Sequence, residues 1–98
     1  MDKPTKQEIK EFWEKYADNC ESFNQDKHRH YRFGNEYYED EPPIDLNNLF
    51  KYAVPKLKAV YPNWRVVLHA WVIELTGDCD KDTLALFWAL DKVKEMKE

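Results

Sequence analysis

The chain has 98 residues, of which 35% are charged and 15% aromatic, and its formal net charge is −4 at pH 7. This length suits one domain with a small core, and the aromatic content excludes a disordered chain despite the many charges. The negative charge gives no general attraction to nucleic acid or to anionic membranes. We therefore expect a single domain over residues 1–98, and nucleic-acid binding is disfavoured.

Cysteine usage and apolar runs bear on the compartment. The two cysteines, Cys20 and Cys79, do not amount to a disulfide framework. No apolar run follows the first six residues, and no segment approaches the length of a membrane span. We therefore expect a cytoplasmic protein with free thiols, without a signal peptide and without contact to a membrane.

The first predicted element is a helix. Residues 5–8, Thr-Lys-Gln-Glu, form a capping box in which Thr5 is the N-cap and Glu8 the third helical residue. Apolar residues then recur at helical spacing, namely Ile9, Phe12, Trp13, Tyr16 and Cys20. The helix is expected from about residue 6 to residue 17 or 19, and the polar residues 18–27 are expected to form a loop.

A hairpin is predicted next. Gly34-Asn35 separates the strand-like runs 28–33 and 36–39, and Gly followed by Asn is typical of a two-residue type II′ turn. The hairpin is polar, so it should lie towards a sheet edge with one face in water. Tyr31 and Phe33 share one face of the first strand.

An amphipathic helix with a proline inside it follows the hairpin. Asp45 is a good N-cap, and the apolar residues recur at steps of three and four, namely Leu46, Leu49, Phe50, Ala53, Leu57 and Val60. Pro55 cannot donate to the carbonyl of Lys51 and clashes with it. We expect the helix to kink near Val54 or to break into two pieces.

Residues 64–76, Trp-Arg-Val-Val-Leu-His-Ala-Trp-Val-Ile-Glu-Leu-Thr, are interpreted as a long central strand. The run is rich in Val, Ile, Trp and Thr, and it is apolar on both faces when read with a period of two. Such a strand is usually covered on both faces. A helix is the rival prediction, which the β-branched content and the turn at Pro62 and Asn63 weaken.

The last element is a helix capped by Asp80 or Asp82 and ending near Lys97. Its expected buried face consists of Ala85, Leu86, Ala89, Leu90, Val93 and Met96. Leu84 and Trp88 lie off this face at 100° per residue. They are either covered by the hairpin or the first loop, or exposed as an interface anchor.

The predicted order is α-β-β-α-β-α, and the fold class is α+β. We expect a small antiparallel sheet, formed by the hairpin and the long central strand, packed with helices. The portion from Pro42 onwards resembles the phage α-β-α sandwich domain, a family of small phage and prophage proteins. The matching pieces are residues 42–46, the helix through Phe50 and Val54, the Trp-initiated strand, Gly77-Asp78 and residues 82–86. The family has no established activity, so the resemblance implies a fold and a mobile-element origin but no catalytic residue.

Candidate catalytic and metal-binding residues are few. His28 and His30 point to one side of a strand, and Cys20 or Asp18 could join them in a metal site, although structural zinc needs four ligands. His69 is either a core histidine or an acid–base group that lacks an identifiable partner. Cys79 lies near a helix N-terminus, where thiolates are favoured.

Two candidate contact surfaces remain. Tyr37 and Tyr38 lie within an acidic strip formed by Glu36 and residues 39–41, which suits a basic partner or a solvated sheet edge. The other surface is Leu84 with Trp88. The leading hypothesis is therefore a non-enzymatic protein of phage or prophage type that acts by protein–protein contact or self-association, with no cofactor.

Two alternatives stay open. One is a small metal-dependent or thiol enzyme that uses His28, His30, His69 or Cys79. The other is weak nucleic-acid binding through a modest basic patch of Lys51, Lys56, Lys58 and Arg65.

Overall fold

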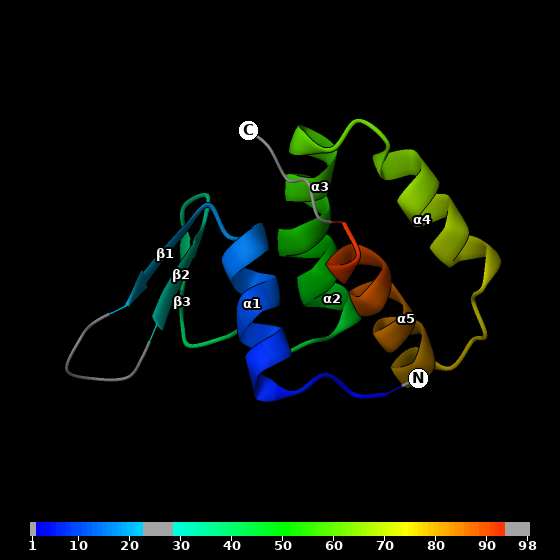
Figure 1. Cartoon of the computed structure of the whole chain (residues 1–98), viewed down its shortest axis with the longest axis horizontal. Helices are drawn as coiled ribbons and strands as arrows, with labels where there is room; N and C mark the ends of the chain where they lie inside the picture. The colour runs from blue at the N-terminus through cyan, green and yellow to red at the C-terminus, as the bar shows by residue number, and fades with distance from the viewer. Residues whose placement is uncertain (1, 23–28, 94–98) are drawn as a thin grey trace.

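The computed structural model describes residues 2–22 and 29–93, which form a helical body with a small sheet at one end (Figure 1). The elements in chain order are α1 (Lys6–Tyr16), β1 (Asn19–Ser22), β2 (Arg29–Phe33), β3 (Glu36–Glu39), α2 (Leu46–Asn48), the π-helical turn η1 (Leu49–Ala53), α3 (Val54–Val60), α4 (Trp64–Ile73) and α5 (Cys79–Asp91). The predicted α+β class with a small antiparallel sheet is confirmed.

The capping box at the start of α1 is confirmed. The Glu8 backbone N–H donates to Thr5 Oγ1 at 3.1 Å, and the Thr5 N–H donates to Glu8 Oε1 at 2.9 Å. The helix ends at Tyr16 because Ala17 turns to an extended conformation. Its apolar stripe is buried through Phe12, Trp13 and Tyr16, as the helical spacing predicts.

The sheet has three antiparallel strands in the order β1-β2-β3. Asn19–Ser22 forms β1 against β2, so the predicted loop is wrong over these residues, and its remainder lies outside the described residues. The polar composition of β1 carries no strand signal of its own. Its conformation depends on pairing with the otherwise open edge of β2, which supplies the hydrogen-bond partners.

The predicted hairpin between β2 and β3 is confirmed. Phe33 pairs with Glu36 around the turn, and Gly34 has φ +59°, while Asn35 does not have a positive φ. A positive φ at the first turn residue alone fits type II′ rather than type I′. Tyr31 and Phe33 are both buried, whereas Arg32 is exposed, so one face of the hairpin is buried and the other is exposed to solvent.

The helical run from residue 46 to residue 60 continues through Pro55 without a break. Asp45 caps it as predicted, because its carboxylate accepts the Asn48 N–H at 2.7 Å. In the turn before the proline, the Val54 N–H bonds to the carbonyl of Leu49, five residues back. Pro55 has no N–H to donate to the carbonyl of Lys51, and the wider π-helical turn accommodates the proline within a continuous run. The predicted break into two pieces is therefore wrong, while a kink near Val54 stays a prediction.

The most important correction concerns residues 64–76. Trp64–Ile73 is the helix α4 and not a central strand, so the predicted order with a third long strand is also wrong. A continuous apolar run does not distinguish a strand from a helix by periodicity, and the predicted run over residues 64–76 is longer than the usual strand of about 3–10 residues. The residues that contact the core, Trp64, Val67, Leu68 and Trp71, follow steps of three and four, which is the helical pattern.

The final helix α5 begins earlier than predicted and also ends earlier. Asp78, not Asp80 or Asp82, is the N-cap, and its carboxylate accepts the N–H groups of Asp80 and Lys81. The helix ends at Asp91, and Met96 lies outside the described residues. The buried residues of its latter half are Leu86, Phe87 and Leu90, with Val93 after the helix, so Phe87 was missed and Ala85 and Ala89 are only partly covered.

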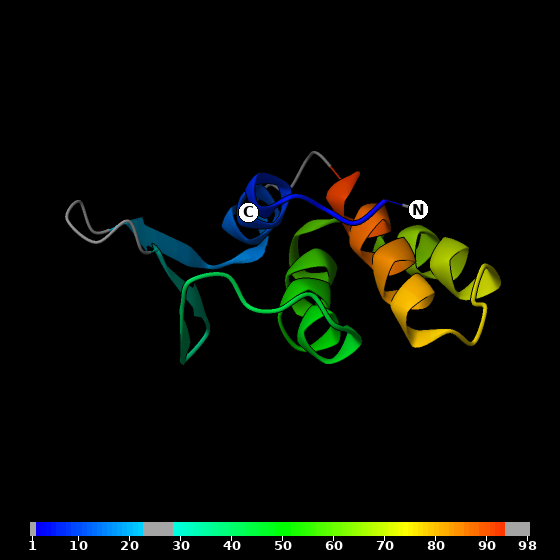
Figure 2. The same ribbon diagram turned by 90° about the horizontal axis from the view of Figure 1, so that it is seen from below.

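The core lies where α1, the helical run and α5 meet. Phe12 of α1 packs against Phe87 of α5 with ring centroids 4.6 Å apart. Trp13 donates its indole N–H to the carbonyl of Pro42 at 2.9 Å, and Tyr16 donates its hydroxyl to the carbonyl of Leu90 at 2.7 Å. These bonds join three segments that are distant in sequence, and Figure 2 shows the sheet and α4 at opposite ends of this core.

Candidate functional site

The histidines considered for catalysis or metal binding are not brought together. His30 lies on β2 in the sheet, whereas His69 is exposed on α4 at the other end of the molecule (Figure 1). His69 is therefore not the core histidine that the strand prediction implied. His28 lies outside the described residues. Within residues 2–22 and 29–93, no three His, Cys, Asp or Glu side chains form a group that could hold a metal ion.

The two cysteines are free and lie in different surroundings. Cys20 is half-buried on β1, and burial raises the pKa of its thiol, with a smaller effect from the charge of Glu41. Cys79 is exposed at the first residue of α5. The carboxylate of Asp78 already accepts backbone N–H groups at this helix start. No described histidine lines the shallow cavity that contains Cys79.

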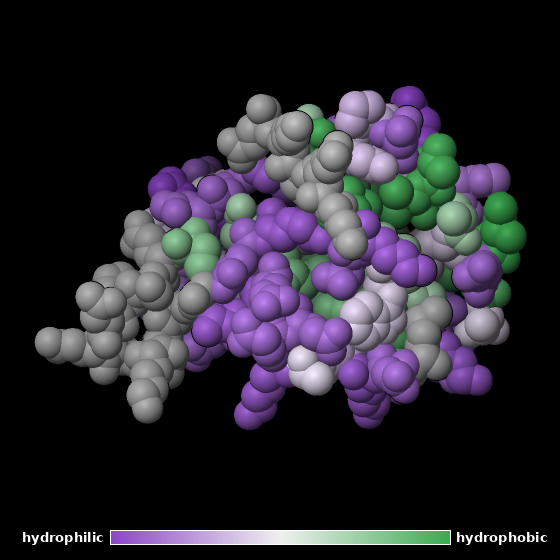
Figure 3. Space-filling view, in the orientation of Figure 1, coloured by the Kyte–Doolittle hydropathy of each residue, from purple (hydrophilic) through white to green (hydrophobic). Residues whose placement is uncertain are grey.

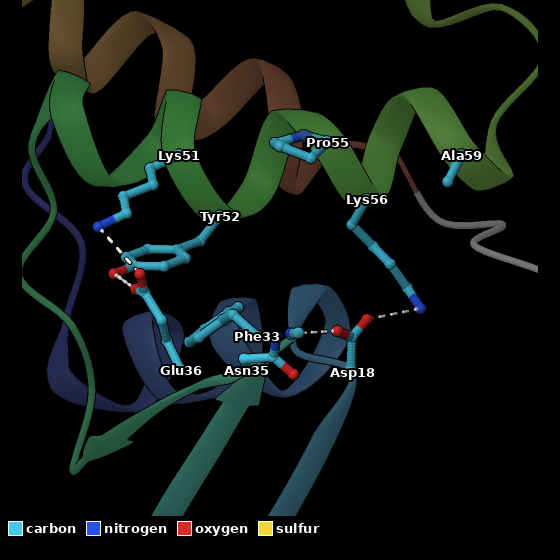
Figure 4. Close-up of a pocket in the computed structure, with 10 residues that line it drawn as sticks. Asp18, Phe33, Asn35, Glu36, Lys51, Tyr52, Pro55, Lys56 and Ala59 are labelled. Atoms are coloured by element: carbon cyan, nitrogen blue, oxygen red, sulfur yellow. Dashed lines mark hydrogen bonds and ion pairs between the residues drawn. The ribbon is translucent and has the colours of Figure 1, made fainter.

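A cavity of about 500 Å³ lies between the hairpin tip and the helical run (Figure 4). Its apolar floor is formed by the rings of Phe33 and Tyr52, whose centroids are 4.6 Å apart. Lys51 Nζ lies 3.3 Å from Glu36 Oε1 on one side. On the other side, Asp18 pairs with Lys56 at 3.6 Å and accepts the Gly34 N–H at 2.7 Å.

The charges in this cavity are matched to one another. The Tyr52 hydroxyl donates a short hydrogen bond to Glu36, and this bond together with Lys51 holds the pKa of the Glu36 carboxyl below its usual value. Burial, and then the bond to Glu36, raises the pKa of the Tyr52 hydroxyl. Because each lysine faces a carboxylate from the sheet side, the arrangement acts as a clamp that ties the hairpin to the helices.

The predicted basic patch does not form a single surface. Lys51 and Lys56 are engaged with the carboxylates of the cavity just described. The cationic groups of Lys58 and Arg65 instead lie over the ring of Trp64, at 5.0 and 4.6 Å from its centroid. These four residues therefore do not converge on one groove.

Leu84 and Trp88 are both partly buried, so neither is a fully exposed anchor. Trp88 packs edge-on against Phe87 with centroids 4.9 Å apart, and its indole N–H donates to the carbonyl of Asp2 at 2.9 Å. Leu84 lines a separate shallow cavity with Lys3 of the N-terminal segment. The N-terminal segment, and not the hairpin, covers part of these two side chains. The sequence contains no signal for this long-range contact.

Tyr37 and Tyr38 point to opposite sides of β3. Tyr38 is half-buried and packs edge-on against Tyr52, with centroids 5.5 Å apart. Tyr37 is 63% exposed, and the guanidinium of Arg32 lies over its ring at 5.6 Å. Only Tyr37 of this pair is available to a partner.

The outer surface of α4 is the feature that the sequence interpretation missed. The helix has no buried residue, and Val66 and Ile73 are 68% and 69% exposed. Val72 on α4 and Leu75 just after it are also exposed. Phe50 is exposed as well, and its ring packs against Trp71 of α4 with centroids 5.5 Å apart. In Figure 3 the hydrophobic colouring gathers over α4, while the surface over α1 is mainly hydrophilic. A helix that is apolar around most of its circumference is normally buried. Exposed apolar side chains on such a helix therefore mark a candidate interaction surface.

A groove of about 400 Å³ runs between α4 and α5 beside this outer surface. Small residues lie along it, namely Ala70, Ala85 and Ala89, with Trp71 and Trp88 as larger lining groups. Trp71 is held in place because its indole N–H donates to the carbonyl of Asp82 at 2.9 Å. The groove is therefore mainly apolar and has room for side chains of another helix.

No helix among residues 2–22 and 29–93 is long and apolar enough to cross a membrane. No family model, curated protein or solved structure matches this chain.

Proposed function

We propose that this protein is non-enzymatic and acts by protein–protein contact, with the outer face of α4 as the contact surface. The single observation that supports the proposal is an apolar helix of ten residues without one buried residue. The contact surface named from the sequence, Leu84 with Trp88, is replaced as the leading choice because both residues are already partly covered.

The energy available is appropriate for a specific but modest contact. Fully burying a Val, Leu, Ile or Phe side chain contributes about 1.5–3 kcal/mol. Val66 and Ile73 share one side of α4 and are 68% and 69% exposed, so covering these two contributes roughly 3 kcal/mol, and the contact must extend to the neighbouring residues of the groove. Association costs at least about 4 kcal/mol in lost rigid-body freedom, so the surface supports binding only when a partner covers most of it.

The competing functions have weaker support. A thiol enzyme needs a base beside the sulfur, and the described surroundings of Cys79 contain Asp80 and Thr83 but no histidine. A phage or prophage origin is a proposal that rests on the sequence resemblance alone. It agrees with a small protein that works through a contact surface, but nothing in the α4 surface depends on it.

Site-specific photo-crosslinking tests the proposal. A photo-reactive amino acid is placed at position 73 and, as a control, at position 7, which is exposed on α1. We expect light-dependent adducts from position 73 in the source cell, either with a second copy or with another protein, and none from position 7. Equal yields at the two positions, or none at either, would contradict the proposal.

A further inference from the structure

We propose that the partner of α4 is a second copy of this chain, bound with the two α4 helices antiparallel about a two-fold axis near Ala70. This inference rests on the proposed function, because it names the occupant of the same surface. In such an isologous contact the same patch serves both copies, so each feature of the patch must complement another feature of that patch.

The shape of the outer face fits a helix of the same kind. Val66, Ala70 and Ile73 follow each other at steps of four and three, which places them on one stripe of α4. All three are exposed. With an axis near Ala70, Val66 of one copy meets Ile73 of the other, and the small side chain at the centre lets the two backbones approach closely.

The groove between α4 and α5 extends this contact. Val66 and Ala70 belong to the stripe and also line the groove, so a helix lying on the stripe also reaches the groove. The alanines of α5, Ala85 and Ala89, leave room there. Two copies joined in this way place α4 and α5 of each chain in a four-helix arrangement, in which apolar stripes on all four helices face one another.

The charges at the two ends of the groove favour a second copy as the partner, and they favour an antiparallel orientation of the two α4 helices. Glu74 and Lys92 both line the groove, and both are exposed. Glu74 follows the last residue of α4, and Lys92 follows the last residue of α5. Figure 1 shows that α4 and α5 run in opposite directions, so the two charges lie at opposite ends of the groove.

An antiparallel second copy brings each Glu74 towards the end of the groove where the other copy carries Lys92. The contact thus contains two equivalent pairs of opposite charge. A parallel arrangement would instead place the two Glu74 side chains at the same end, where they repel. A self-complementary groove with one acid and one base at its ends is therefore best matched by another copy of itself.

Charge reversal provides the test. The molar masses of wild type, Glu74→Lys, Lys92→Glu and the double variant are measured by sedimentation equilibrium from about 1 to 200 µM, a range around the micromolar affinity expected of a small interface. We expect the wild type to change from monomer to dimer across this range. Each single reversal should weaken dimerisation roughly tenfold, and the double variant should recover most of the loss.

The recovery is specific to the proposed geometry. Within one chain the two residues lie at opposite ends of the groove, so a compensating pair forms only between copies. Thermal unfolding of each variant checks that the fold is intact. A wild type that stays monomeric over the range, or a double variant as weak as the two single losses combined, would overturn the proposal.

Failure of this inference is separable from failure of the proposed function. If the wild type is monomeric while position 73 crosslinks to a different protein, the second copy is excluded and α4 stays the contact surface. If position 73 gives no crosslink and the wild type is monomeric, both proposals are wrong.

Discussion

At the sheet end of the molecule, the aromatic rings of Phe33, Tyr38 and Tyr52 pack on one another, and lysines on the helical run face carboxylates on the sheet side. At the opposite end, α4 places Val66 and Ile73 in water. Both regions are rich in large side chains, but these rings and charges of the sheet end contact one another within the chain, whereas the two apolar side chains of α4 are left exposed. On the proposed function, the sheet end contributes to stability, whereas the α4 end would contribute to association.

The largest expected effect is on the stability of the closed core. Trp13 is fully buried and donates to the Pro42 carbonyl, so Trp13→Ala should lower the free energy of unfolding by about 3–5 kcal/mol. Ile73→Ala, a truncation at an exposed site, should change it by less than about 0.5 kcal/mol. Urea unfolding of the two variants measures this contrast, and similar losses for both would show that α4 belongs to the core.

The next effect is on association and leaves stability nearly unchanged. Ile73→Glu places a charge on the apolar stripe and should weaken association by at least roughly tenfold, because the charge must be desolvated on contact. Gln7→Glu on α1 adds the same charge at a distant exposed position and should have no effect. Light scattering during size-exclusion chromatography compares the two variants, and equal behaviour would remove α4 from the interface.

A smaller effect is expected at the clamp between hairpin and helices. Tyr52→Phe keeps the buried ring but removes the hydroxyl that donates to Glu36, which should cost about 1 kcal/mol of stability. Hydrogen exchange should increase in the hairpin and not in α4. Increased exchange in α4 alone would mean that the clamp and the association surface are coupled.

The smallest effect is confined to acidic pH and concerns the loop between α4 and α5. Backbone and hydroxyl donors of Thr76, at 2.9 Å each, and the Gly77 N–H, at 3.1 Å, hold the pKa of the Asp82 carboxyl below its usual value. Below the ordinary aspartate pKa of about 3.9, the unfolded chain therefore binds this proton more readily than the folded chain. The stabilisation is complete above that pH and is lost as the pH falls through the lower, folded value.

Asp82→Asn separates this contribution from the other acids. The variant should show a shallower loss of stability between about pH 4 and pH 2 than the wild type, as measured by thermal unfolding across that range. An unchanged slope would show that Asp82 does not contribute to the acid sensitivity.

Local signals in the sequence predicted local structure well. The capping box at Thr5 and Glu8, the cap at Asp45 and the turn at Gly34 each depend on residues within a few positions of one another, and all three are confirmed. One failure is nonlocal. Strand β1 forms because β2 offers hydrogen-bond partners, and nothing in residues 19–22 alone encodes that pairing.

The candidate site was predictable only in part. The sequence shows that the run from Trp64 is apolar on both faces when read as a strand, but an apolar residue does not reveal whether its own chain or another chain covers it. Read as a strand, the run was expected to be buried on both faces. Read as a helix, the same residues leave a stripe exposed, so one error in periodicity concealed the surface that is now the leading candidate.

The most direct test of the account is hydroxyl-radical footprinting of α4 in a concentrated sample or source-cell extract and in a dilute purified sample. Val66, Ile73 and Tyr37 are similarly exposed in the single chain, at 68%, 69% and 63%, so each side chain is compared with itself under the two conditions. The account predicts that oxidation of Val66 and Ile73 falls in the concentrated sample or extract while oxidation of Tyr37 is unchanged. Unchanged oxidation of Val66 and Ile73 would contradict the claim that another chain covers α4.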